Sequence, residues 1–228
     1  MNSRVCILVL SAVFLWSCSS GPVYKDAEAP VDDRVEDLLC RMTLEEKIWQ
    51  ITQGHLGRND NPNNVVKSAT VPPFVGSMIN YSEDSRVANA FQRYALDSTR
   101  LGIPVLFGYD VIHGFKTSFP IPLAQAASFN TELASQAASI SAAEAYATGI
   151  HWTFSPMVDI ARDPRWGRVM EGYGEDPVLA SAFCEAVVKG YQGDDPAAPG
   201  HIAACLKHYV GYGASDGGRD YAQVDMSH

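Results

Sequence analysis

The chain has 228 residues, of which 46% are hydrophobic and 19% charged, and its formal net charge is −9. These proportions are typical of a globular protein with a sizeable core, and they exclude a disordered, collagen-like or disulfide-dense chain. The acidic balance argues against a nucleic-acid partner, because phosphate binding requires basic patches. The six histidines and five cysteines lack CxxC or HExxH spacing, so the sequence predicts neither a metal site nor a cofactor.

The N-terminus has the pattern of a bacterial export signal. Arg4 precedes an apolar run, Val5 to Trp16, which is too short to span a bilayer as a helix of about 20 residues. The run leads into Ser17-Cys18, which resembles a lipobox, where the cysteine is acylated and becomes the first mature residue. We predict a lipoprotein signal peptide over 1–17, lipidation of Cys18 and a tether over 18–30. The protein would then be held at a bacterial membrane, in the periplasm or at the cell surface. An ordinary cleaved signal with an incidental cysteine is the alternative.

From residue 31 onward, the hydrophobic pattern predicts helices that alternate with strands. Predicted helices cover 31–50, with a second helix opening at Thr43, and then 84–99, 130–149 and 176–191. Predicted strands cover 74–79, 103–109, 150–154 and 203–209. Asn130 and Asp176 are the expected N-caps of the last two helices. Such alternation indicates an α/β fold with a parallel sheet covered by helices.

The length favours an incomplete barrel. Four strand–helix units fill residues 74–228, whereas a closed barrel of eight units takes about 250 residues. We therefore predict that 31–228 form a parallel (β/α) barrel of TIM type, truncated to about its first half. A smaller open doubly wound sheet would give the same pattern, since both folds gather polar residues at the C-terminal ends of strands.

Six motifs occur in a fixed order along the chain. They are GIPV (102–105), YDVIHG (109–114), FP with ASFN (119–130), SPMVD (155–159), RDPRWGR with EGYGEDP (162–177), and KHY (207–209). Together they resemble the N-terminal barrel of glycoside hydrolase family 3, particularly its periplasmic β-glucosidase branch. The resemblance implies retaining hydrolysis of terminal non-reducing β-D-glucosyl or β-xylosyl residues of oligosaccharides.

The resemblance also implies that Asp110, Arg168, Lys207 and His208 bind the sugar, with this chain supplying the sugar-binding half of the barrel. A pyranose needs a carboxylate beside cationic donors, and these side chains provide that set. By pattern alone, Asp110 could instead cap a helix or turn, and Arg168 could belong to a surface ion-pair network. Asp159, Asp163 and Glu171 are expected to support the loop through hydrogen bonds, and Trp166 is expected to pack rather than to stack on sugar. The family's nucleophile and acid/base are expected beyond His228, so no residue here is assigned a catalytic role.

Two other patterns in the sequence bear on the function. Residues 213–217 match the G-x-S-x-G elbow of serine hydrolases, but only Asp220, Asp225 and His228 follow to complete a triad, which favours a glycine-rich loop by chance. Residues 210–213 lack the histidine of the hexosaminidase branch, which favours the glucosidase or xylosidase branch. A non-catalytic sugar-binding lipoprotein, or an inactive truncated remnant, is the alternative to an enzyme.

Overall fold

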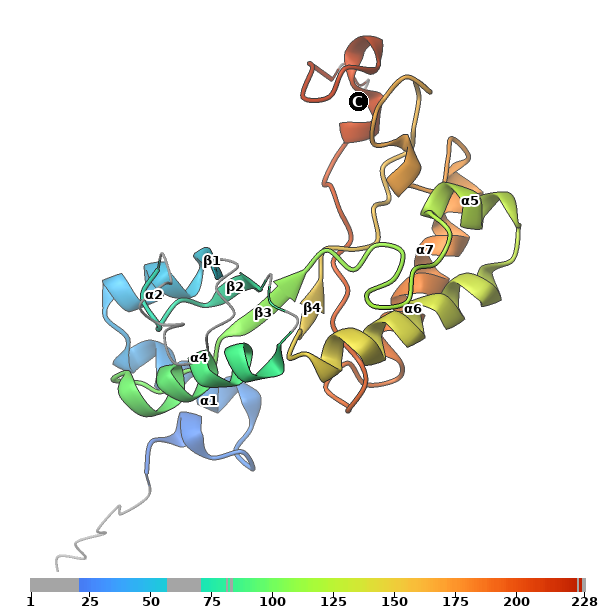
Figure 1. Ribbon diagram of the computed structural model, residues 1–228. Coiled ribbons are helices and arrows are strands. Elements are labelled where there is room, and N and C mark those ends of the chain that lie inside the picture. The colour runs from blue at the N-terminus through green and yellow to red at the C-terminus, as the bar shows by residue number, and fades with distance from the viewer. Residues whose placement is uncertain (1–20, 57–70, 81, 83, 225, 227–228) are drawn as a thin grey trace, which may run out of the picture. The chain divides into compact units, whose positions relative to one another are not determined.

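The computed structural model describes residues 21–56, 71–80, 82, 84–224 and 226 (Figure 1). It divides the chain into two compact units, one ending at Thr43 and the other beginning at Leu44. The predicted signal peptide 1–17 and the predicted lipidation site, Cys18, lie outside the described residues. Within the described ranges, every helix is too short or too polar to span a membrane.

The first unit contains the short 3-10 helix η1 (Val23–Lys25) and helix α1 (Val31–Arg41). The backbone N–H of Tyr24 donates to Asp37 at 3.1 Å, and the carbonyl of Tyr24 accepts from Nε of Arg34 at 3.3 Å. These bonds tie η1, which lies within the predicted tether 18–30, to α1. Helix α1 begins at residue 31, and the domain boundary predicted there stays a prediction.

The second unit is built on a four-stranded parallel sheet. Its strands are β1 (Gln53–Leu56), β2 (Ser77–Asn80), β3 (Leu106–Tyr109) and β4 (Trp152–Thr153), and they lie side by side in the order of the sequence. The predicted α/β class with a parallel sheet is therefore confirmed. A doubly wound sheet reverses its strand order at a switch point, whereas these strands follow one another without reversal, as in a barrel. The sheet is open rather than closed.

The helices of this unit begin where the sequence supplies caps. They are α2 (Leu44–Gln50), α4 (Ser85–Ser98), α5 (Pro122–Ala127), α6 (Thr131–Ala147) and α7 (Pro177–Gln192). Asn130 accepts from the N–H of Leu133 at 3.2 Å, and Asp176 accepts from the first N–H groups of α7. Both predicted N-caps are thus confirmed. Each satisfies donors that the first helical turn leaves without partners.

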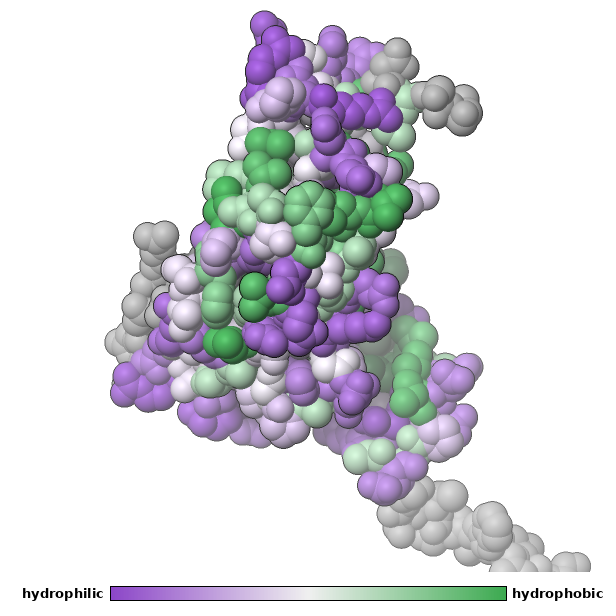
Figure 2. Space-filling model, turned by 90° about the vertical axis from the view of Figure 1, so that its right-hand side faces the viewer, coloured by the Kyte–Doolittle hydropathy of each residue, from purple (hydrophilic) through white to green (hydrophobic). Residues whose placement is uncertain are grey.

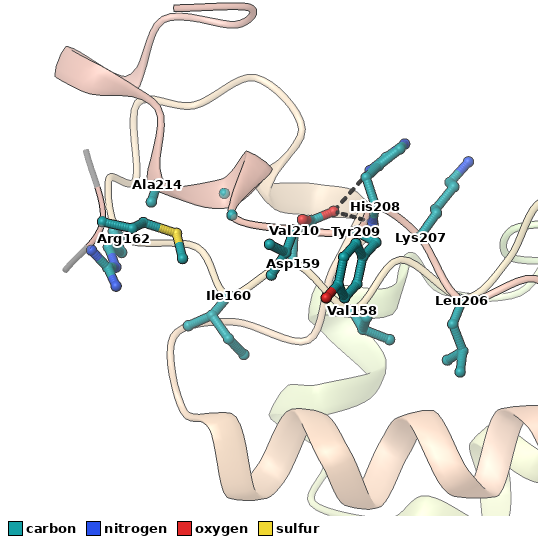
Figure 3. Close-up of a pocket in the computed structure, with 13 residues that line it drawn as sticks. Val158, Asp159, Ile160, Arg162, Leu206, Lys207, His208, Tyr209, Val210 and Ala214 are labelled. Atoms are coloured by element: carbon teal, nitrogen blue, oxygen red, sulfur yellow. Dashed lines mark hydrogen bonds and ion pairs between the residues drawn. The ribbon is translucent and has the colours of Figure 1, made fainter. Parts of the chain in front are cut away.

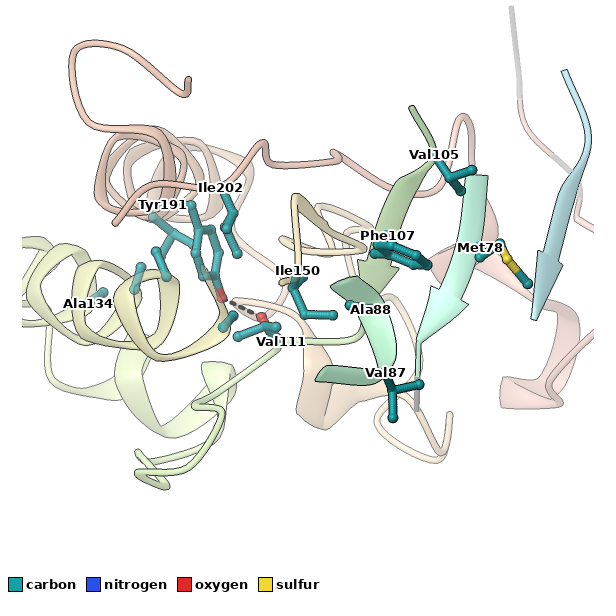
Figure 4. Close-up of a cluster of buried hydrophobic side chains, with 14 of the residues drawn as sticks. Met78, Val87, Ala88, Val105, Phe107, Val111, Ala134, Ile150, Tyr191 and Ile202 are labelled. Carbon is teal, nitrogen blue, oxygen red and sulfur yellow. Dashed lines mark hydrogen bonds between the residues drawn. The ribbon is translucent and has the colours of Figure 1, made fainter. Parts of the chain in front are cut away.

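The hydrophobic core fixes the segment that follows β3 (Figure 4). Helix α4 buries one face, and its Phe91 packs edge-on against Phe107 of β3, with ring centroids 6.1 Å apart. On the other side, the hydroxyl of the buried Tyr191 in α7 donates to the carbonyl of Val111. The N–H of Val111 donates to Thr153 Oγ1 at 3.1 Å. Since Val111 is held from two sides, its neighbour Asp110 has a defined position at the end of β3.

The strand predicted over 203–209 does not form. Two isolated parallel bridges, Trp152–Ala203 and Met157–Lys207, and a few backbone hydrogen bonds link this segment to the chain around β4. The segment runs alongside its neighbour, but Pro156 lies between the two bridges and has no N–H to donate to a continuous ladder. Among the described strands and α-helices, β1 and α5 are the ones that the sequence pattern does not predict. The first is short and carries glycine and histidine instead of β-branched residues, and the second has only six residues.

Helices α6 and α7 pack closely at a glycine. A Cβ added to Gly190 of α7 would lie 2.3 Å from the carbonyl oxygen of Ser135 in α6 and 2.8 Å from Cβ of Ala138. No side chain fits such a gap without moving one helix. Alanine favours a helix over glycine by about 1 kcal/mol, but here the steric overlap dominates.

We therefore expect Gly190→Ala to destabilise the protein by about 1–3 kcal/mol, measured as a lower midpoint of urea unfolding with an unchanged slope. Gly167→Ala is the matched control, because a Cβ there meets no atom within 4 Å. The control should stay within about 0.5 kcal/mol of the wild type. A Gly190→Ala protein as stable as the control would show that α6 and α7 can separate at no cost.

Apolar surface remains exposed beside α7. A groove of about 600 Å³ runs along this helix. Its apolar lining includes Val158, Ile160, Ala180, Val188 and Leu206. Figure 2 shows apolar surface gathered in a band, bounded by hydrophilic side chains, on the face where α6 and α7 lie in Figure 1. Surface of this kind commonly marks a site that another protein segment covers.

Candidate functional site

A cleft opens at the C-terminal end of the sheet, where polar side chains from four segments meet. Its volume is about 490 Å³. It is lined by Gln53, Ile79, Asp110, Ile112, Phe154, Arg168, Glu171, Lys207 and His208. All four residues predicted to bind sugar therefore line one cavity. They come from segments up to 98 positions apart in the sequence, between Asp110 and His208.

Asp110 and Lys207 form an ion pair across the cleft. Asp110 directly follows β3, and Lys207 lies at the isolated bridge to Met157. Nζ of Lys207 donates to Oδ1 of Asp110 at 3.1 Å, and the Asp110 side chain is 57% exposed. The interpretation of Asp110 as a helix cap is not supported, because no helix begins there. An exposed carboxylate held by one cation keeps lone pairs available for hydroxyl groups in the cleft.

Arg168 makes a bidentate ion pair with Glu171. Nε of Arg168 donates to Oε1 of Glu171 at 2.7 Å, and Nη2 donates to Oε2 at 2.6 Å. Both residues belong to the turn around the short 3-10 helix η2 (Val169–Glu171). The pairing raises the pKa of Arg168 and lowers that of Glu171, because each ion stabilises the charged form of the other. Glu171 therefore holds the Arg168 side chain in place, and both side chains stay charged.

His208 is held by a buried carboxylate (Figure 3). Oδ2 of Asp159 accepts from the backbone N–H of His208 at 3.0 Å and lies 2.8 Å from Nδ1 of its ring. The Asp159 side chain is only 2% exposed. A carboxylate can only accept, so Nδ1 carries a proton and Nε2 is the nitrogen left for the cleft. A second cavity, of about 420 Å³, lies at the other side of this pair.

Two residues that the sequence reasoning did not select, Tyr212 and Asp220, lie behind the cleft. The Tyr212 ring is in contact with Arg168, His208 and the buried Trp166. Its hydroxyl donates to Asp220 Oδ1 at 2.6 Å. Burial, and then this hydrogen bond, raises the pKa of Tyr212 to about 12. No local pattern in the sequence indicates the contact of Asp220 with Trp166, because it joins residues 54 positions apart.

Ser215, the serine of the G-x-S-x-G pattern, lacks the exposed hydroxyl that a nucleophile needs. Ser215 is 5% exposed, and its hydroxyl donates to the carbonyl of Tyr212 at 2.8 Å. The glycines on either side of it belong to two short 3-10 helices, η3 (Tyr212–Ala214) and η4 (Asp216–Gly218), rather than to a strand-to-helix elbow. This geometry agrees with a glycine-rich loop.

Sequence comparisons point to one family. The family description "Glycosyl hydrolase family 3 N terminal domain" matches residues 43–228. A periplasmic beta-glucosidase from Salmonella typhimurium is 41% identical over 93% of this chain, which corresponds to 30% of the relative. A putative beta-xylosidase from Formosa agariphila is 32% identical over 96% of this chain and 32% of the relative.

Solved structures agree with the sequence comparisons. A beta-glucosidase from Listeria innocua, crystallised as a D270A mutant with laminaribiose, is 43% identical with a TM-score of 0.76. The similarity covers 86% of this chain and 29% of that one. The chain thus spans less than one third of the length of these relatives. The matched residues, the parallel sheet and the shared fold lead to one conclusion: this chain belongs to glycosyl hydrolase family 3, and it carries the barrel-type N-terminal domain of that family.

Proposed function

We propose that this chain supplies the sugar-binding half of the barrel of a longer β-glucosidase-type enzyme, which releases terminal non-reducing β-D-glucosyl residues from oligosaccharides. The observation that carries the proposal is the cleft in which Asp110, Arg168, Lys207 and His208 come together. Relatives named beta-glucosidase, and a Listeria innocua relative solved with glucose, support the same substrate class.

The cleft suits a pyranose ring. The free oxygen of Asp110 can accept from two neighbouring hydroxyls, while Arg168 and Lys207 donate to others. His208 presents Nε2, which accepts from a hydroxyl when the ring is neutral and donates when it is charged. Hydrogen bonds that tighten as the ring flattens toward an oxocarbenium-like state lower the barrier as well as the dissociation constant.

The carboxylates around the cleft are already engaged. Asp110 is paired with Lys207, Glu171 with Arg168, and Asp159 with His208. A retaining glycosidase needs one carboxylate to attack the anomeric carbon and a second carboxyl, about 5–5.5 Å away, to protonate the leaving group. Glu171 has a lowered pKa, so it is a poor proton donor. We therefore assign the nucleophile and the acid/base of this retaining mechanism to parts of the longer enzyme beyond His228.

The decisive experiment is kinetic. The longer protein should hydrolyse an aryl β-glucoside with retention of anomeric configuration, followed by NMR of the first sugar product. The same assay with an aryl β-xyloside compares the two kinds of relative, and we expect the glucoside to give the higher kcat/KM. Saturable glucose binding without turnover would favour the sugar-binding lipoprotein. The absence of both binding and turnover would favour the remnant.

We also propose that a lipid on Cys18 anchors the protein at a bacterial membrane, in the periplasm or at the cell surface. The support is the lipobox-like sequence and a relative named periplasmic beta-glucosidase. Stable anchoring would require several acyl chains, because each buried CH₂ contributes only about 0.8 kcal/mol to the free energy of membrane binding.

Replacing Cys18 by Ala should move the protein from the membrane fraction to the soluble fraction, measured by immunoblotting after ultracentrifugation. Cys6→Ala is the matched control, because Cys6 lies within the apolar run of the signal and should leave anchoring unchanged. Equal membrane retention of the Cys18→Ala variant and the control would rule out the anchor.

A further inference from the structure

One aromatic ring contacts two of the four cleft residues. The guanidinium carbon of Arg168 lies 5.4 Å from the centroid of the Tyr212 ring. The ring of His208 meets the same tyrosine edge to face, with centroids 4.8 Å apart and planes at 83°. The ring face is electron-rich and attracts a guanidinium, and an edge-to-face aromatic pair has a preferred geometry. Tyr212 therefore constrains both side chains together.

Asp220 fixes that ring in turn. A single oxygen, Oδ1 of Asp220, accepts from the hydroxyl of Tyr212 at 2.6 Å and from Nε1 of Trp166 at 3.0 Å. Trp166 is 1% exposed and packs edge-on against Tyr212, with centroids 5.2 Å apart. The Asp220 carboxylate thus connects the Tyr212 hydroxyl to the indole of the buried Trp166. The two hydrogen bonds also lower the pKa of Asp220, so it stays an acceptor at neutral pH.

The loop that carries Asp220 is itself closed by main-chain bonds. Ser215 and Val224 form an antiparallel bridge, and the N–H of Asp216 donates to the carbonyl of Gln223 at 3.0 Å. This closed loop returns Asp220 to Trp166, which lies 54 positions earlier in the sequence. The loop thereby holds Asp220 against Trp166, which lies two positions before the cleft residue Arg168.

We infer that Tyr212, anchored by Asp220, is a positioning residue that holds Arg168 and His208 in one sugar-binding geometry. The inference rests on the proposed function. It adds that Tyr212 and Asp220 preorganise the sugar-binding cleft. Tyr212 acts through its ring and not as an acid or base, because its pKa of about 12 keeps the hydroxyl protonated at neutral pH.

The test uses the longer enzyme with an aryl β-glucoside. Tyr212→Ala removes the ring and should lower kcat/KM about 30-fold, mostly through kcat, since a loosened geometry costs most in the transition state. Tyr212→Phe keeps the ring but loses the bond to Asp220, and a smaller loss of about fivefold is expected. Asp220→Asn retains an acceptor oxygen and should stay within about threefold. Tyr146→Ala, at an exposed tyrosine of α6, is the control and should leave kcat/KM unchanged.

A double-mutant cycle separates positioning from general stability. In an Arg168→Ala background, the further loss caused by Tyr212→Ala should fall from about 30-fold to below about 10-fold, because one of its two targets is gone. An equal loss in both backgrounds, or wild-type kinetics for Tyr212→Ala, would overturn the inference. If the wild-type enzyme does not hydrolyse the β-glucoside at all, the proposed function fails instead. The two failures are therefore distinguishable.

Discussion

Asp110→Asn in the longer enzyme is expected to lower kcat/KM for an aryl β-glucoside by about 100-fold or more. The substitution keeps the shape of the side chain but removes the charge that accepts strong hydrogen bonds from sugar hydroxyls. It also replaces one acceptor oxygen by an NH₂ group, which only donates. Losing charged hydrogen bonds that tighten toward the transition state costs about 3 kcal/mol, which corresponds to roughly 100-fold.

Stability should change little in this variant, so the kinetic effect can be interpreted directly. The Asp110 side chain is 57% exposed, so water screens its pair with Lys207, and asparagine keeps one acceptor oxygen for the less exposed ammonium group. The thermal midpoint therefore serves as the control measurement. Unchanged kcat/KM in a folded Asp110→Asn enzyme would remove Asp110 from the sugar site and with it the main support for the proposed substrate class.

Arg168→Lys should lower kcat/KM at least about 50-fold although the charge is kept. The guanidinium uses Nε and Nη2 for Glu171 and has Nη1 in addition, while its central carbon lies over the Tyr212 ring. A lysine has one nitrogen in place of three and no planar surface, so it cannot reproduce the fork and the stacking together.

Glu171→Gln is the informative partner variant. Glutamine retains one acceptor oxygen for Arg168 but loses the bidentate ion pair, and we expect an intermediate loss of about tenfold. If Arg168→Lys and Glu171→Gln are both close to the wild type in kcat/KM, then the Arg168–Glu171 pair is only a surface ion pair, which was the alternative raised by its sequence context.

The sequence could predict the parts of the site that depend on local order. Asp110 was found because it ends an apolar strand, and Lys207 and His208 because a pair of basic residues ends an apolar segment. Parallel strands place such ends at one edge of a sheet, so proximity follows from topology. The N-caps Asn130 and Asp176 could be predicted for the same reason, since capping involves only residues two or three positions away.

The remaining features depend on contacts that no local pattern encodes. The contact between Asp159 and His208 joins residues 49 positions apart in the sequence. The hydrogen bond from Trp166 to Asp220 joins residues 54 positions apart. Both depend on how loops cross above the sheet. The segment 203–209 was apolar enough for a strand, but its continuous pairing depends on Pro156 in the neighbouring segment. Propensity within one segment says nothing about the donors that its neighbour lacks.

The strand order described above also bears on how the sheet assembles during synthesis. Because β1, β2, β3 and β4 lie in the order of the sequence, each strand pairs with the one made just before it. Each of these pairings can therefore form as soon as the segment that connects the two strands has emerged. Chains with such nearest-neighbour pairing close short loops first and fold faster than chains that join distant segments. The sheet can thus grow in one direction, with its newest strand always at the growing edge.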